Sequence, residues 1–119
     1  MTPRLPTEAP ASWDAIIVGA GPAGSVAAID LARAGARVLI LDRAAFPREK
    51  ACGDALPPAA VDLLRELGVA VPLVFAERVT FVSPGGRAVS MPREAGIDGA
   101  LVRRARLDSA LLEAAMNRS

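Results

Sequence analysis

One glycine-rich segment and one later carboxylate have the types and spacing needed to hold a dinucleotide. The pattern G-x-G-x-x-G is satisfied by Gly19, Ala20, Gly21, Pro22, Ala23 and Gly24, and Asp42 lies 18 residues after Gly24. In such a segment the first glycine permits a tight turn, the second admits a pyrophosphate, and the third lets a helix pack closely. Asp42 is placed to accept hydrogen bonds from the adenosine ribose hydroxyls. That carboxylate disfavours the 2′-phosphate of NADP, whereas NAD and FAD both remain open because both carry ADP.

The elements predicted around this segment are those that the pattern requires. Residues 15–18 form an apolar, β-branched run, typical of a strand buried on both faces. A helix is predicted over residues 22–34, opened by Pro22 and ended by Gly35. Residues 37–41 predict a second buried strand that ends at Asp42. The alternative is a β-α-β turn with a purely structural role, but the strand, helix and carboxylate together favour a nucleotide site.

The rest of the chain predicts an antiparallel addition to this β-α-β unit. Residues 43–56 are expected to form a loop, and a helix over 58–67 is expected to stop at Gly68. Strands over 75–82 and 87–91 predict a hairpin, followed by a strand over 100–103 and a helix over 107–117. The fold class is therefore α/β, a Rossmann-like β-α-β unit with an antiparallel hairpin insertion. Two or three parallel strands make a small sheet, so we expect the fold to be incomplete.

Composition excludes several classes of function. The chain has 119 residues, 14 Lys and Arg against 13 Asp and Glu, one Cys and no His. The balanced charge argues against nucleic acid as a partner. A single Cys excludes a disulfide scaffold, and the lack of His excludes His-dependent triads and most zinc sites, so no metal is expected. No apolar leader is found at the start, and charged residues interrupt the longest apolar region, so a cytoplasmic protein is expected.

A loop and a later arginine motif add a narrower signal. The residues concerned are Leu41-Asp42-Arg43, Phe46-Pro47-Arg48, Lys50, Cys52-Gly53-Asp54, Leu56, Arg104-Ala105-Arg106-Leu107-Asp108 and Leu111. With the glycine segment, they resemble the FAD-dependent oxidoreductases of the geranylgeranyl reductase family, within the aromatic-hydroxylase-like flavoprotein superfamily. The resemblance runs from Asp14 to Ala115. Members often have Glu at the position of Asp42 and Gly at that of Ala55.

The resemblance implies an extended FAD. Its ADP half is expected to lie on the glycine segment and Asp42. Arg104 is expected near the flavin side of the pyrophosphate, and residues 48–54 are expected to run toward the flavin ring. The implied cofactor-binding residues are Gly19, Gly21, Pro22, Ala23, Gly24, Asp42, Arg43, Arg48, Cys52, Gly53, Asp54 and Arg104. From the residues alone, a solvated side chain is the favoured interpretation of Arg104, and only the resemblance favours a contact with the flavin. Cys52 could be a small semi-buried residue or a catalytic group whose thiolate Arg48 and Lys50 favour.

The resemblance also implies an activity and a domain organisation. Residues 1–12 are expected to be a disordered lead, and residues 13–119 the N-terminal part of an FAD-binding domain, with hairpin 75–92 toward a substrate domain. The implied reaction reduces carbon–carbon double bonds of a geranylgeranyl or quinone prenyl chain, with NAD(P)H or another external reductant and peripheral membrane contact. The alternatives are a flavin monooxygenase or halogenase with an aromatic substrate, and an inactive truncated nucleotide-binding module. The isolated chain is expected to be a poor enzyme, and its oligomeric state stays open.

Overall fold

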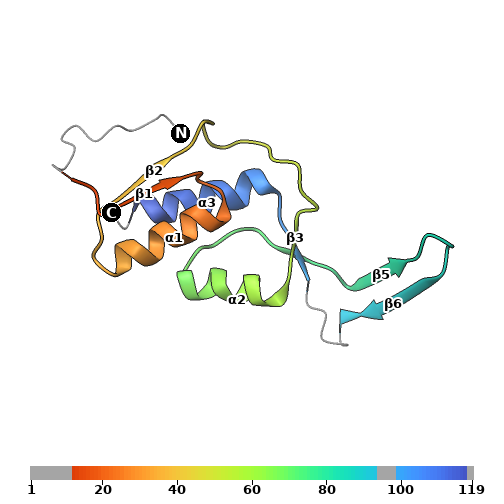
Figure 1. Cartoon of the computed structure of the whole chain (residues 1–119). Helices are drawn as coiled ribbons and strands as arrows, with labels where there is room; N and C mark the ends of the chain where they lie inside the picture. Colours follow the sequence, from red (N-terminus) through yellow and green to blue (C-terminus); the bar gives the residue numbers. More distant parts are fainter. Residues whose placement is uncertain (1–11, 94–98, 118–119) are drawn as a thin grey trace. The chain divides into compact units, whose positions relative to one another are not determined.

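The computed structural model describes residues 12–93 and 99–117, so most of the expected disordered lead lies outside the described residues. The chain divides into two compact units, residues 1–51 with 104–119 and residues 52–103. Figure 1 shows their helices and strands along the chain. Mixed helices and strands confirm the predicted α/β class.

The first unit contains the predicted β-α-β element. Strand β1 (Ala15–Val18) and strand β2 (Val38–Leu41) are joined by helix α1 (Pro22–Arg33). The strands pair in parallel, with Ala15 opposite Val38 and Val18 opposite Leu41. Pro22 is the first residue of α1, and Gly35 follows its end with a φ of 85°, so both predicted boundary residues have the expected role.

The strands are not buried on both faces, and that prediction is wrong. Ile16 and Val18 are 59% and 84% exposed, and Leu41 is also exposed. The side chains of β1 alternate between half-buried and exposed, as they do in a strand with one covered face. The expectation that further strands and layers complete this sheet stays a prediction.

At their starting ends the two strands are joined by Asp14 and Arg37. The Asp14 carboxylate accepts hydrogen bonds from the Arg37 backbone N–H at 2.8 Å and from its Nε at 3.1 Å. These bonds lower the pKa of Asp14 to about 2. The contact lies at the opposite end of the strands from the glycine segment.

Helix α3 (Arg104–Met116) returns to this first unit and begins three residues earlier than predicted. It packs beside α1 (Figure 1). Its buried face includes Leu107, Leu111 and Ala115. Leu112 joins Ala20 and Phe46 in a buried cluster against Ile40 of β2. The loop after β2, the glycine segment and α3 therefore share one core.

The second unit is antiparallel and holds the helix α2 (Pro58–Leu67), which stops at Gly68 as predicted and buries Val61, Leu64 and Leu67. Strands β3 (Ala55–Leu56) and β4 (Val74–Phe75) both pair with β7 (Ala100–Leu101). Strand β5 (Arg78–Val82) pairs with β6 (Ala88–Pro92) as the predicted hairpin. The single strand expected over 75–82 is wrong, because the chain changes pairing partner between Phe75 and Arg78. β3 was predicted to be part of a loop. It is only two residues long, too short for an alternation of apolar and polar residues to indicate a strand.

Among residues 12–93 and 99–117, no helix has the length and apolar character needed to cross a membrane.

The close packing of α1 predicts a large effect for Gly24→Ala. A Cβ at residue 24 would overlap the carbonyl oxygen of Gly19 and lie 3.2 Å from Cγ2 of Ile17. Since backbone must move to relieve the overlap, we expect the free energy of unfolding to fall by about 1–3 kcal/mol in denaturant titration. The control is Gly85→Ala, where a Cβ meets nothing within 4 Å. Equal stability losses in the two variants would contradict the packing account.

Candidate functional site

The glycine segment ends at the N-terminus of α1 and leaves that helix end without a side-chain cap. Gly19 has a φ of 107°, which favours glycine, and its N–H donates to the carbonyl of Leu41 at 2.7 Å. Gly21 is the N-cap residue and makes no side-chain capping bond, and the first turn of α1 carries no acidic side chain. The first-turn amides and the positive end of the helix dipole together suit an anion.

Asp42 is held against the glycine segment by backbone donors. Its Oδ2 accepts from the N–H of Ala20 at 2.8 Å, and its Oδ1 accepts from the N–H of Ala44 at 2.8 Å. These two bonds, with smaller contributions from Arg48 and Arg43, hold the pKa of Asp42 below its usual range. The side chain is therefore ionised and oriented at neutral pH. Each oxygen retains a second lone pair, and the predicted bond to ribose hydroxyls stays a prediction.

Two arginines from separate segments meet on one buried carboxylate. Asp108 is completely buried on the first-to-second turn of α3. Its Oδ1 accepts from Nε of Arg104 at 2.8 Å, and its Oδ2 accepts from Nη2 of Arg104 at 2.9 Å. Nη1 of Arg48, from the loop after β2, lies 3.0 Å from Oδ2. Both arginine side chains are 17% exposed, so Arg104 is not the solvated side chain of the alternative interpretation.

The same two guanidinium groups lie beside the second glycine of the motif. A Cβ at Gly21 would lie 3.8 Å from Nη2 of Arg48 and 3.9 Å from Nη2 of Arg104. Arg48 also stacks over the ring of Phe46, 4.8 Å from its centroid, and Phe46 is buried beside Ala20. Two arginines against one aspartate leave an excess positive charge beside an uncapped helix end. The space that Gly21 keeps open therefore fits the pyrophosphate of a dinucleotide.

The structure brings together only part of the predicted set. One group belongs to the first unit and lies around the start of α1: Gly19, Gly21, Gly24, Asp42, Arg48 and Arg104. The first turn of α1 includes Pro22 and Ala23. Arg43 is an exposed neighbour of Asp42. Cys52, Gly53 and Asp54 belong to the second unit, where Cys52 is exposed rather than semi-buried. Their expected place beside the flavin ring, and the catalytic role considered for Cys52, stay predictions.

Asp108 is the site residue that sequence reasoning did not single out as functional. A signal was present, because Asp108 follows Arg104 by one helical turn and stands between Leu107 and Leu111 on the buried face. A carboxylate on such a face requires a partner.

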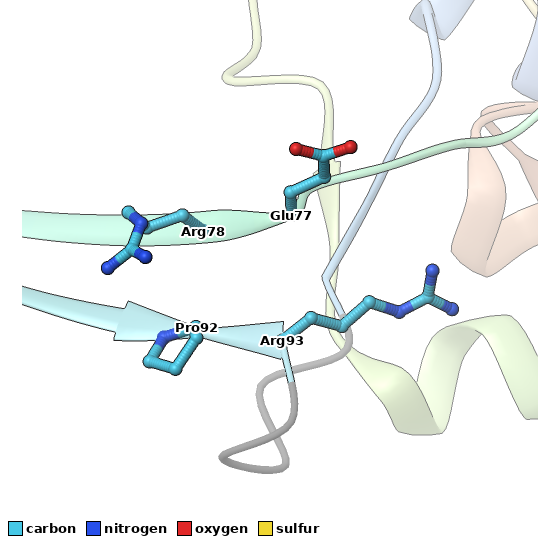
Figure 2. A pocket seen from close by; sticks show the side chains of 4 residues that line it. All are labelled: Glu77, Arg78, Pro92 and Arg93. Carbon is cyan, nitrogen blue, oxygen red and sulfur yellow. The ribbon is translucent and has the colours of Figure 1, made fainter.

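A separate hollow lies at the base of the hairpin in the second unit. Its lining consists of Glu77 and Arg78 on the β5 side and Pro92 and Arg93 on the β6 side (Figure 2). Arg93 stacks on the ring of Phe75 at 4.8 Å. None of the predicted cofactor residues lines this hollow. No cluster of metal-ligating side chains is found in the part of the chain that the structure describes.

The two backbone bonds of Asp42 predict a pH-dependent cost for Asp42→Asn. The amide nitrogen cannot accept a hydrogen bond, so one bond is lost; since Asp42 is exposed, we expect about 1 kcal/mol at neutral pH. The folded pKa lies below the unfolded value of about 3.9, so this stabilisation is present above that pH and is lost as pH falls through the folded pKa. Urea unfolding between pH 2 and 7 measures it. The control is Asp62→Asn, which alters an exposed aspartate. If the free energy of unfolding differed between Asp42→Asn and wild type by the same amount at every pH, the interpretation would be contradicted.

Comparison with known proteins places this geometry in a family. Residues 12–80, more than half of the chain, match the family described as FAD binding domain. The chain is 59% identical over 58 residues to a menaquinone reductase of Mycobacterium tuberculosis, covering 49% of this chain and 14% of that protein. It is 45% identical over 93 residues to a geranylgeranyl diphosphate reductase of Rhodobacter capsulatus, covering 76% and 22%. The chain therefore spans less than a quarter of either relative.

The fold has the same affiliation. The solved structure of the flavin-dependent brominase Bmp2 superposes with a TM-score of 0.76 at 27% identity, covering 90% of this chain and 28% of that one. The resemblance inferred from the glycine, loop and arginine motifs is confirmed by these matches, and so is the Rossmann-like fold. The chain belongs to the FAD binding domain family.

Proposed function

We propose that the start of α1 binds the ADP-pyrophosphate half of FAD. The observation that carries this proposal is the pair of guanidinium Nη2 atoms within 4 Å of the position that a Cβ at Gly21 would occupy. The first-turn amides of α1 and the forks of Arg48 and Arg104 bind the phosphate oxygens. Asp42, oriented by Ala20 and Ala44, accepts from the ribose hydroxyls. Bound FAD supplies the redox chemistry that none of these side chains can perform.

The chemical suitability of each group supports this assignment. A guanidinium presents parallel N–H donors that pair with phosphate bidentately, and it stays charged at every physiological pH. Phe46 and Asp108 limit the freedom of the arginines, so less entropy is lost when a ligand binds. The absence of a side chain at Gly21 admits the phosphates to the backbone. These residues orient the cofactor.

For the whole protein we propose the reduction of carbon–carbon double bonds in an isoprenoid chain. The names of two relatives, menaquinone reductase and geranylgeranyl diphosphate reductase, support a geranylgeranyl or quinone prenyl substrate. The reaction adds two electrons and two protons to the double bond, and the electrons come from NAD(P)H or another external reductant. A prenyl-lipid substrate favours a cytoplasmic protein with peripheral membrane contact.

A second candidate is oxygen-dependent chemistry on an aromatic substrate, as in a monooxygenase or halogenase. The match to a brominase over 90% of the chain favours it. The same ADP-binding geometry serves both candidates. They differ in the acceptor of electrons, which is a double bond in the first and molecular oxygen in the second.

The nucleotide assignment predicts that both arginines distinguish ADP from adenosine. In the 119-residue chain we expect ADP to bind more tightly than adenosine in isothermal titration calorimetry. Arg48→Gln and Arg104→Gln should each weaken ADP binding at least about tenfold, since a charged hydrogen bond is worth about 1.5–3 kcal/mol. Arg65→Gln, which alters an exposed arginine of α2, is the matched control. Equal ADP affinity in wild type and both site variants would contradict the assignment.

The reductase assignment is tested with the complete protein under argon. We expect chemically reduced enzyme to saturate a double bond of a menaquinone or geranylgeranyl substrate, detected as a mass increase of about 2 Da, with FAD as the electron carrier. An oxygenated or halogenated aromatic product formed only in air would favour the second candidate. Flavin binding without turnover in either condition would favour a non-catalytic module.

A further inference from the structure

We infer that Asp108 is a positioning residue for the cofactor pyrophosphate, holding Arg48 and Arg104 together at the start of α1. The inference rests on the proposed function, because it assigns a role to a residue that contacts both arginines of the proposed phosphate site. Asp108 contacts both arginines, Arg104 through both carboxylate oxygens and Arg48 through Oδ2.

Burial shows why this carboxylate must act through its partners. Asp108 has no exposed surface, and a buried carboxylate is tolerated in a protein only when it is paired. Its two oxygens are engaged by Arg104 Nε, Arg104 Nη2 and Arg48 Nη1 at 2.8, 2.9 and 3.0 Å. Its partners are both arginines of the phosphate site, one from a loop and one from its own helix. Asp108 therefore links two segments that the sequence separates.

Charge shows what the link achieves. Two guanidinium groups near one glycine repel each other, and a single aspartate between them offsets that repulsion while leaving an excess positive charge. Arg104 uses its Nε edge on Asp108, a bidentate contact that fixes the plane of the guanidinium. Arg48 is close to Asp108 through Nη1, a buried atom that makes no hydrogen bond in the structure, while Nη2 lies toward Gly21. Arg48 makes only one contact with Asp108, so its Nη2 is the donor that can reach a ligand at Gly21.

The positioning role and simple electrostatics predict opposite results when the charge of Asp108 is removed. Without the carboxylate the site gains one positive charge, so a purely Coulombic site would bind a pyrophosphate more tightly. If Asp108 positions the arginines, its loss separates or reorients them, and binding weakens despite the added positive charge.

The test compares Asp108→Asn with Glu113→Gln in the 119-residue chain. Glu113 is an exposed residue of the same helix, and its variant makes the same change in net charge. Titration calorimetry with ADP and adenosine is expected to show that Asp108→Asn weakens ADP binding at least tenfold, leaves adenosine binding unchanged, and so removes the preference for ADP. Glu113→Gln is expected to match wild type. ADP binding by a folded Asp108→Asn variant that equals or exceeds wild type would overturn the inference.

A second measurement on wild type needs no variant, and decides the matter if Asp108→Asn does not fold. In ¹H–¹⁵N spectra, the Nε–H of Arg104 is expected to exchange slowly with solvent and to shift when ADP is added, but not when adenosine is added. The exposed Nε–H of Arg65 is the internal control. ADP binding with no shift at Arg104 would overturn the role of Asp108 while leaving nucleotide binding intact. No ADP binding by wild type would overturn the proposed function, and the inference with it.

Discussion

The pairing of one buried carboxylate with two arginines organises the first unit around the start of α1. Asp108 has no access to water, so Arg48 and Arg104 must remain beside it. This requirement brings the loop after β2 against the first turns of α3, and Phe46 and Leu112 pack with Ala20 of the glycine segment in the same region. Replacing a buried ion pair with apolar residues is often stabilising. The charged arrangement therefore suits a ligand better than it suits stability alone.

A second constraint is the close approach of α1 to the turn that precedes it. Gly24 has no room for a side chain because the Gly19 carbonyl occupies that position, and Gly19 itself needs a positive φ. Asp42 then fastens the turn by accepting from Ala20, so the end of β2 and the glycine segment form one rigid corner. The cluster of charges and this corner meet at Gly21. The anion site that we propose there combines backbone geometry on one side with guanidinium placement on the other.

Much of the corner formed by the glycine segment and the end of β2 could be predicted from the sequence, because interactions between residues close in the chain determine it. Proline at the first helical position, glycines at the turn and a carboxylate after the second strand each act within a few residues, and β1, α1 and β2 lie where expected. Pairing choices could not be predicted in the same way. The strand expected over 75–82 divides between two partners, and β3 exists only because residues 55–56 meet β7. The exposure of Ile16 and Val18 likewise depends on what covers the sheet rather than on the residues themselves. The place of Asp108 on a buried helix face could be predicted from the sequence. Its pairing with Arg48 and Arg104 could be found only in the three-dimensional structure.

Above all, we propose that the start of α1, with Arg48 and Arg104, is a pyrophosphate site. The most direct measurement is a crystal structure of the chain with ADP bound. We expect both phosphates over Gly21, with oxygens about 2.7–2.9 Å from the guanidinium nitrogens of Arg48 and Arg104 and from first-turn amides of α1. ADP bound with its phosphates away from both arginines, or on the hairpin hollow lined by Glu77 and Arg93, would contradict it.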